Sequence, residues 1–306
     1  MNIIELIGNT PLVELRRLNP AADRVQLFGK LESRNPGGSI KDRVALSMVE
    51  AGERSGELTR DKILLEATSG NTGIGMAMMC AAKRYRCQLI MPESASIERR
   101  LIMQAYGAEI ILTPAKRATD GAIEKAYALA REYPERYFLA DQFNNPANWL
   151  AHYTTTAPEI WAQTEGRVTD IIVTLGTSGT AMGLSRWFRE HHPEVRVIAV
   201  EPHAGHKIQG LKNMKESYRP GIFDKTLPHA IVNVADEDAF SAARRLAAEE
   251  GVFAGMSSGA AVSAAIERAR ELDSGCIVAI LPDGGERYLS TTLFRPRQKP
   301  EPEASQ

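Results

Sequence analysis

One lysine of this chain lies where an unprotonated amine is favoured. It is Lys41, in the segment 35–43 with the sequence NPGGSIKDR. Asn-Pro-Gly-Gly is a strong turn signal, the residues 41–52 have helical spacing, and Ser39 can cap that helix. Lys41 is then in the first turn, where the helix dipole disfavours a cation and a neutral amine could attack an aldehyde. The segment favours a lysine nucleophile, with a solvated surface lysine as the alternative.

A second segment, 66–75 with the sequence EATSGNTGIG, joins an expected strand at 63–67 to an expected helix at 72–83. A helix N-terminus with free N–H groups binds a carboxylate or a phosphate. Hydroxyl and amide side chains here can donate hydrogen bonds, and glycines allow a ligand to approach closely: Ser69, Asn71, Thr72, Gly70 and Gly73. The alternative is an ordinary capped turn between a strand and a helix.

A third segment, 176–183 with the sequence GTSGTAMG, follows the apolar run 171–175 and opens another helix. Glycines and hydroxyls at such a junction suit a phosphate cradle. The rival interpretation is a dinucleotide site, because a strand at 195–200 follows and ends in Glu201. The glycine spacing is G-x-x-G-x-x-x-G and not G-x-G-x-x-G, so the dinucleotide fingerprint fails.

The fourth segment, 255–259 with the sequence GMSSG, by itself predicts only a pair of capping serines before a helix at 259–272. Together, the four segments offer a lysine nucleophile, a carboxylate site, a phosphate site and one further hydroxyl. That set matches the needs of pyridoxal phosphate, which requires a lysine, a phosphate cradle and a partner for its ring nitrogen.

Alternating strands and helices must position these segments. Strands are expected at 25–32, 63–67, 87–91, 109–112, 170–175, 195–201 and 276–281, and helices at 41–52, 72–83, 97–106, 121–132, 180–191, 237–250 and 259–272. The alternation predicts an α/β fold with mostly parallel sheets, which bind ligands beyond the carboxyl ends of their strands. With 306 residues, two lobes are expected.

Composition narrows the class of ligand and the compartment. Charged residues make up 25% of the chain and the formal net charge is -1, which gives no footprint for nucleic acid or an anionic membrane. The three cysteines are scattered and odd in number, which favours a reducing cytoplasm over a disulfide framework. We expect neither a signal peptide nor a membrane span nor a metal site. Residues 295–306 are rich in proline and charge and are expected to form a disordered tail.

Several longer motifs extend this pattern over nearly the whole chain. They are IGNTPLVEL at 7–15, DQFNNPAN at 141–148, HKIQG at 206–210 and ERYLST at 286–291. With the four segments above, the sequence resembles the cysteine synthase (O-acetylserine sulfhydrylase) family of fold-type II pyridoxal phosphate enzymes, closest to the B type. The resemblance implies a fold like that of the tryptophan synthase β-subunit. A larger lobe would comprise 1–37 and 147–294, a smaller mobile lobe 38–146, and the cofactor would lie in the cleft between them.

The resemblance also implies a role for each site residue. Lys41 would form the Schiff base with the cofactor and act as the catalytic base. Further cofactor contacts would come from Asn71, Gly176, Thr177, Ser178, Gly179, Thr180 and Ser257, with Ser257 facing the ring nitrogen. The substrate would be held by Thr68, Ser69, Thr72 and Gln142, which bind its carboxylate, and by the loop that contains Gly210.

The activity that the resemblance implies is β-replacement: L-cysteine is made from O-acetyl-L-serine and sulfide, or thiosulfate, through an α-aminoacrylate. A homodimer and a serine acetyltransferase partner are also implied. The alternatives are an O-phosphoserine sulfhydrylase, a cystathionine β-synthase and, from another class, a nucleotide-binding oxidoreductase. Lys212 occupies a place where O-phosphoserine-using relatives carry a basic residue, and the competing interpretation is a solvated surface lysine.

Overall fold

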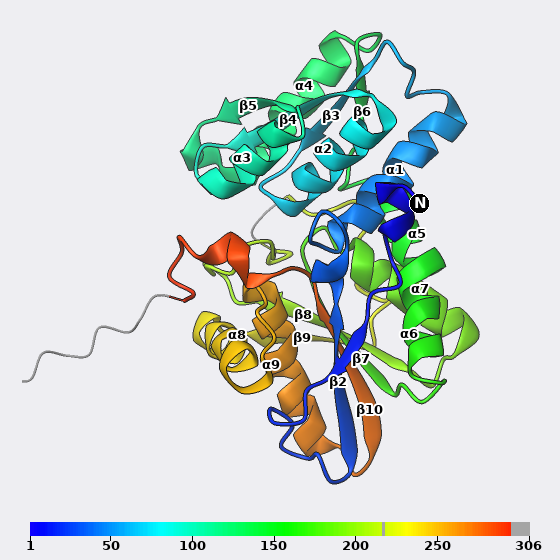
Figure 1. Ribbon diagram of the computed structural model, residues 1–306, viewed down its shortest axis with the longest axis vertical. Helices are drawn as coiled ribbons and strands as arrows, with labels where there is room; N and C mark the ends of the chain where they lie inside the picture. Colours follow the sequence, from blue (N-terminus) through cyan, green and yellow to red (C-terminus); the bar gives the residue numbers. More distant parts are fainter. Residues whose placement is uncertain (216–217, 295–306) are drawn as a thin grey trace, which may run out of the picture.

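The computed structural model describes residues 1–215 and 218–294. They form two lobes, each built on its own sheet (Figure 1). The larger sheet has the strand order β1-β2-β10-β7-β8-β9 and the smaller has the order β5-β4-β3-β6. Helices flank both sheets, so the predicted α/β fold with two mostly parallel sheets is confirmed. The expected tail at 295–306 lies outside the described residues.

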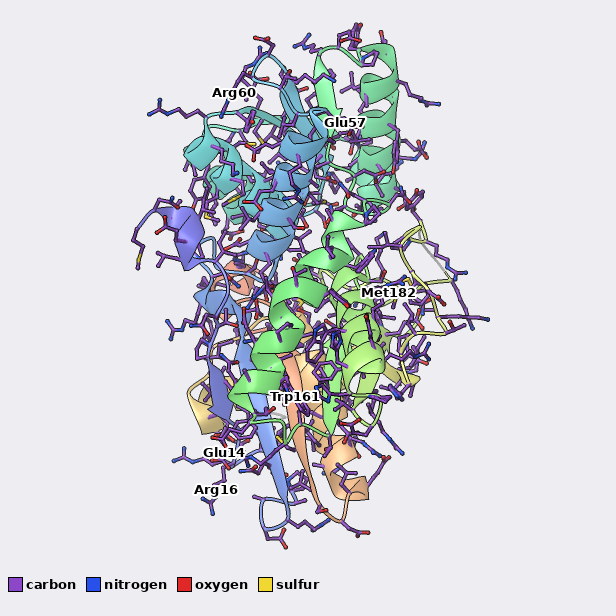
Figure 2. All side chains as sticks on the ribbon, turned by 90° about the vertical axis from the view of Figure 1, so that its right-hand side faces the viewer. Glu14, Arg16, Glu57, Arg60, Trp161 and Met182 are labelled. Carbon is purple, nitrogen blue, oxygen red and sulfur yellow. The ribbon has the colours of Figure 1, made fainter. Side chains whose placement is uncertain are left out.

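The larger sheet is parallel except at one edge, where β1 pairs with β2 in the antiparallel direction. Its strands are β1 (Leu12–Glu14), β2 (Val25–Leu31), β7 (Asp170–Thr174), β8 (Arg196–Pro202), β9 (Ala230–Val234) and β10 (Gly275–Leu281). The central strands are nearly continuous apolar runs because helices cover both of their faces. One face packs against α8 (Asp236–Glu250) and α9 (Met256–Glu271), and the other against α6 (Ala157–Gln163) and α7 (Gly179–His191). Trp161 and Met182, labelled in Figure 2, belong to the α6–α7 side.

The smaller sheet is parallel throughout and comprises β3 (Ile63–Ala67), β4 (Arg86–Pro92), β5 (Glu109–Thr113) and β6 (Tyr137–Leu139). Its two faces pack against α1 (Lys41–Ser55), α2 (Asn71–Lys83) and α3 (Ile97–Ala105) on one side and α4 (Ala118–Glu132) on the other. Helix α1 buries a stripe at helical spacing that includes Val44, Met48 and Val49. It ends at Gly56, whose φ of +74° closes the helix in a left-handed conformation that suits glycine.

Several short elements complete the fold. The 3₁₀ turn η1 (Ile3–Leu6) lies beside the smaller lobe, and Ile4 and Ile7 pack against its apolar cluster. Helix α5 (Ala147–Ala151) continues through a π-helical turn, η4 (His152–Thr156), into α6. The remaining 3₁₀ turns are η2 (Glu32–Arg34), η3 (Ala115–Arg117) and η5 (Gly285–Tyr288). Within residues 1–215 and 218–294, none of the helices is both long and apolar enough to cross a bilayer.

The seven predicted strands and seven predicted helices are all present, with boundaries that differ by a few residues. One boundary corrects a prediction: α9 begins at Met256 and not at Gly259. Gly255 is its N-cap residue, so Ser257 lies inside the first turn and is not a cap. At α1 the N-cap position belongs to Ile40, while the Ser39 hydroxyl accepts the N–H of Lys41 at 3.3 Å.

Candidate active site

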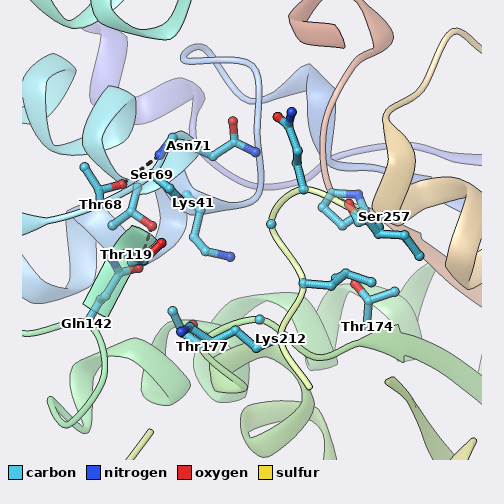
Figure 3. Close-up of a pocket in the computed structure, with 18 of the residues that line it drawn as sticks. Lys41, Thr68, Ser69, Asn71, Thr119, Gln142, Thr174, Thr177, Lys212 and Ser257 are labelled. Atoms are coloured by element: carbon cyan, nitrogen blue, oxygen red, sulfur yellow. Dashed lines mark hydrogen bonds between the residues drawn. The ribbon is translucent and has the colours of Figure 1, made fainter. Parts of the chain in front are cut away.

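The carboxyl ends of strands from both sheets face one cavity of about 650 Å³ between the lobes (Figure 3). Parallel sheets place their loops at this end, which explains why segments distant in sequence meet there. The cavity wall contains every residue that the sequence analysis assigned to the cofactor or the substrate: Lys41, Thr68, Ser69, Asn71, Thr72, Gln142, Gly176, Thr177, Ser178, Gly179, Thr180, Gly210 and Ser257.

Lys41 is the first residue of α1, and its side chain points into the cavity (Figure 3). Burial lowers the pKa of its amine, and the nearby carboxylates of Asp283 and Glu32 oppose this only in part. Helix α2 packs closely against the first turn of α1: a Cβ on Gly75 would lie only 3.0 Å from the carbonyl oxygen of Lys41. The amine is therefore held at a buried helix N-terminus in surroundings that favour its neutral, nucleophilic form.

The turn between β3 and α2 presents N–H groups and hydroxyls to the cavity. The Thr68 hydroxyl accepts hydrogen bonds from the N–H groups of Gly70 and Gly73, at 3.1 and 3.2 Å. Gly70 is the N-cap residue and has no side chain to cap the helix. The Thr72 hydroxyl donates to Oε1 of Gln142 at 2.7 Å. This helix N-terminus is thus shaped to receive an anionic group such as a carboxylate.

The loop between β7 and α7 is a glycine cradle that larger residues could not form. A Cβ on Gly176 would lie 2.5 Å from the carbonyl oxygen of Gly210, and one on Gly179 would lie 1.9 Å from Oδ1 of Asn148. Ser178 adopts φ of +70°, which turns the chain sharply into α7. The Ser178 hydroxyl is buried without a hydrogen-bond partner, although it belongs to the cavity wall. An unpartnered hydroxyl in a helix N-terminal cradle suits a phosphate.

Two residues that the sequence analysis did not assign support this cradle from behind. Asn148 donates to the Thr177 hydroxyl at 3.1 Å, and its side chain also donates to the carbonyl oxygen of Gln142. His152 lies 3.2 Å from the Thr180 hydroxyl and 2.9 Å from the Thr156 hydroxyl. Burial holds the pKa of His152 well below its ordinary range, as do the positive charges of Lys41 and Arg43. Asn148 lies in the motif DQFNNPAN, but His152 is in a helix with no distinctive motif.

The Asn71 amide is held in one orientation by two residues near the C-terminus of the described chain. Its nitrogen donates to Asp283 at 2.6 Å, and its oxygen accepts from Arg287. Tyr288 donates to the same oxygen of Asp283 at 2.7 Å. These contacts use one of the two N–H groups of Asn71 and leave the other for a ligand in the cavity. Arg287 and Tyr288 lie in the motif ERYLST, but the motif by itself did not reveal their contacts with Asn71 and Asp283.

Lys212 is in the cavity wall and is not a solvated surface lysine. Its side chain is 14% exposed, and its ammonium lies 3.8 Å from Asp120 of α4 and 5.4 Å from the ring centroid of Phe143. Burial lowers its pKa, and the charge of Asp120 opposes this effect. Lys212 belongs to a loop of the larger lobe and Asp120 to the smaller lobe, so the pair bridges the cavity mouth.

The arrangement fits pyridoxal phosphate. The cradle at Gly176–Thr180 would hold the phosphate, and the unpartnered Ser178 hydroxyl would gain an acceptor there. Lys41 would supply the amine for the aldehyde, and Ser257, in the first turn of α9, would supply a hydroxyl for the ring nitrogen. The residues of the site therefore meet the three requirements derived from the sequence.

Comparisons with known proteins agree that the chain is of the type that uses pyridoxal phosphate. The family model for pyridoxal-phosphate dependent enzymes matches residues 3–283. A cysteine synthase of Aquifex aeolicus is 46% identical over 299 residues, which cover 95% of this chain and 91% of that protein. Cysteine synthase B of Salmonella typhimurium is 46% identical over 295 residues, which cover 96% of each.

Solved structures of related enzymes share the fold of this chain. The cysteine synthase of Entamoeba histolytica has a TM-score of 0.92 and 39% identity, covering 97% of this chain and 91% of that one. An O-ureido-L-serine synthase has a TM-score of 0.90 and 40% identity, covering 99% and 96%. By sequence over nearly its whole length, and by fold, this chain belongs to the pyridoxal-phosphate dependent enzymes.

Proposed function

We propose that the protein is a cysteine synthase that makes L-cysteine from O-acetyl-L-serine and sulfide. The observation that carries the proposal is the meeting, in one cavity, of the Lys41 amine, the glycine cradle and the turn that precedes α2. The relatives named cysteine synthase support it, since they match along almost the whole chain at 46% identity.

In this proposal each group of residues has one task. Pyridoxal phosphate, when bound, withdraws electrons from the α-carbon of the amino acid. Thr68, Ser69, Thr72 and Gln142 hold the substrate carboxylate and so orient the α-carbon toward Lys41. The Lys41 amine, whose pKa is lowered by burial, takes the α-proton as a general base. Acetate leaves the β-carbon, sulfide forms the new C–S bond, and Lys41 returns the proton.

The other assigned residues act on the cofactor. Asn71 would donate its second N–H to the phenolic oxygen, and the cradle at Gly176–Thr180 would hold the phosphate. Ser257 would supply a hydroxyl for the ring nitrogen. A hydroxyl does not protonate that nitrogen as firmly as a carboxylic acid would, which favours prompt elimination over transamination. Gly210 lies beside the cradle, in the loop that would contact the substrate.

Steady-state kinetics test the proposal. The holoenzyme should turn over O-acetylserine with sulfide, and a second assay with thiosulfate identifies the sulfur donor. Serine with homocysteine tests the cystathionine β-synthase alternative, and hydroxyurea as the nucleophile tests an activity like that of the O-ureido-L-serine synthase. The proposal fails if cysteine formation is absent with both sulfur donors. The oxidoreductase alternative is set aside, because the family is that of pyridoxal phosphate enzymes.

A second candidate substrate is O-phosphoserine. Its support is the position of Lys212, a buried cation in the cavity wall. A phosphate leaving group would gain a charge-assisted contact with this amine that an acetyl ester cannot match. Asp120 competes for the same amine at 3.8 Å, which favours the uncharged acetyl ester.

Motion and assembly complete the proposal. The lobe of residues 38–146 would close on the lobe of 1–37 and 147–294 when the Ser69–Thr72 turn receives a carboxylate.

The family resemblance supports a homodimer and a serine acetyltransferase partner. Three free, buried cysteines support a reducing compartment, the cytoplasm. Sedimentation at micromolar concentration and a pull-down with an acetyltransferase C-terminal peptide test the two assemblies.

A further inference from the structure

Glu66 is a buried carboxyl group that the proposed mechanism does not use. It is the penultimate residue of β3, directly before the turn that faces the cavity, and it is 1% exposed. Its two oxygens accept hydrogen bonds from Gln142, one from the backbone N–H at 3.2 Å and one from the side-chain amide at 3.3 Å. A buried carboxyl without a structural salt bridge is costly, so its position calls for an explanation.

The contacts of Glu66 determine which way the Gln142 amide faces. The nitrogen of that amide also donates to the carbonyl oxygen of Ala67 at 2.7 Å, so both acceptors lie on its nitrogen side. The amide oxygen is thereby left for the Thr72 hydroxyl, which donates to it at 2.7 Å. One carboxyl thus orients, from behind, the pair Gln142 and Thr72. Because both N–H groups of that amide and the Thr72 O–H are donated within the protein, the pair exchanges one of these contacts when it binds the substrate carboxylate.

The surroundings of Glu66 disfavour a negative charge. Burial, and to a smaller extent the carboxylate of Asp141, raise the pKa of Glu66 to about 8, although the amides of Gln142 and Ala67 oppose the shift. Asp141 is held by the Tyr127 hydroxyl at 2.7 Å and by Asn144. The neighbouring strand β4 contributes the thiol of Cys87, whose pKa is also raised, chiefly by Cys80. Glu66 is therefore largely neutral at pH 7.

We propose that Glu66 is a positioning residue: its neutral carboxyl holds the Gln142 amide in place, and its ionisation weakens binding of the substrate carboxylate. The physical reason is that a charged Glu66 would place a second anion directly behind the carboxylate subsite, where few waters screen it. The inference rests on the proposed function only in that the ligand is an amino acid.

Calorimetric titration of the holoenzyme with L-alanine, which has no β-leaving group, tests this between pH 6.5 and 9.5. Glu66→Gln replaces the carboxyl group by an amide of the same shape, which cannot ionise. Ionisation of the ligand amine and of Lys41 affects both proteins equally, so the ratio of their affinities isolates Glu66. The wild-type affinity should fall by about tenfold relative to Glu66→Gln as the pH rises through 8. Equal pH dependence in the two proteins would overturn the proposal.

A second measurement does not depend on binding. Carbon-13 NMR of glutamate-labelled protein should contain one carboxyl signal with a midpoint near pH 8 that Asp141→Asn moves to lower pH. If glutamate carboxyls all titrate below pH 6, Glu66 is ionised at neutral pH and the proposal is wrong. Glu109→Gln, which changes an exposed carboxylate on β5 bonded to Gln88, is the matched control and should alter neither result. Cysteine formation by the wild type, assayed separately, tests the proposed function itself.

Discussion

Arg43, two residues after Lys41 in α1, donates hydrogen bonds of 2.6 and 2.8 Å to the two carboxylate oxygens of Glu159. Arg43 also donates to both oxygens of Glu32, and the amine of Lys30 lies 2.9 Å from Glu159. Among these four side chains the most exposed is Glu159, at 17%. The network joins α1 to β2 and α6, and thereby fixes the first turn of α1 to the larger lobe.

Removing one charge from this network should destabilise the protein strongly. Burial raises the pKa of Glu159, but hydrogen bonds and charge from Arg43 and Lys30 outweigh it and hold the pKa at about 2. Glu159→Gln should cost roughly 3 kcal/mol at pH 7, because it leaves the buried amine of Lys30 without its paired carboxylate and leaves Arg43 with Glu32 alone. The ordinary pKa of a glutamate is higher, so this contribution is complete above about pH 4.5 and declines as the pH falls toward 2.

The midpoint of urea unfolding, measured for both proteins at pH 7, 5 and 3.5, checks this prediction. The gap between wild type and Glu159→Gln should be equal at pH 7 and 5 and smaller at pH 3.5. Glu249→Gln is the control, since it removes a surface pair with Arg245 on α8 and should change stability by less than about 0.5 kcal/mol. A gap that persists undiminished at pH 3.5 would mean that Glu159 is not held ionised by its neighbours.

Lys41→Ala tests the assignment of the nucleophile. The purified wild type should have a visible absorption band that borohydride abolishes, and the variant should lack it. Turnover should fall by several orders of magnitude, because one side chain performs both the covalent and the proton-transfer steps. Lys125→Ala, which alters an exposed lysine on α4, should leave both the band and turnover unchanged. Full activity of Lys41→Ala would exclude the assignment.

The glycine cradle should not tolerate a single methyl group. A Cβ on Gly179 would meet Oδ1 of Asn148 at 1.9 Å, so Gly179→Ala must displace the side chain that supports Thr177. The dissociation constant of pyridoxal phosphate should rise at least about tenfold, by loss of one or more charge-assisted hydrogen bonds. Gly107→Ala is the control, because its Cβ would meet nothing within 4 Å and its backbone strain, at φ of +86°, lies away from the cavity wall. Unchanged cofactor affinity in Gly179→Ala would separate this loop from phosphate binding.

The parts of the fold that could be predicted are those with strong local signals. Central strands such as β7 and β10 are nearly continuous apolar runs, and helices such as α1 have clear periodicity and turn residues before them. Strands β1 and β6 have three residues each, and β9 is largely exposed at the sheet edge, so their pairing depends on distant strands. Helix α5 passes through a π-helical turn into α6, and tertiary packing governs that irregular path.

The site divides in the same way. Glycine and hydroxyl motifs at strand–helix junctions marked Lys41, the turn before α2 and the cradle, because those residues must be of particular types in a particular order. The supporting side chains could not be found from spacing alone. Asp283 reaches Asn71 across 212 residues and Glu66 reaches Gln142 across 76, so only the folded chain reveals these contacts.

The choice between the two leaving groups should depend on the pair Lys212 and Asp120. An ammonium 3.8 Å from a carboxylate is partly neutralised and offers little to a dianionic phosphate. Asp120→Asn removes the competing charge without changing the shape of the side chain. It should therefore raise kcat/KM for O-phosphoserine relative to O-acetylserine, by about tenfold for a charge-assisted contact worth roughly 1.5 kcal/mol.

Lys212→Ala should have the opposite effect, depressing any turnover of O-phosphoserine while leaving O-acetylserine almost untouched, since the acetyl ester carries no charge for the amine to bind. The double variant separates the two contributions: if Asp120 acts only by masking Lys212, its removal has no effect once the lysine is gone. The measurement is the ratio of kcat/KM values for the two substrates in the four proteins. If both substrates change equally in every variant, or none of the four uses O-phosphoserine, Lys212 does not meet the leaving group and O-acetylserine stands as the substrate.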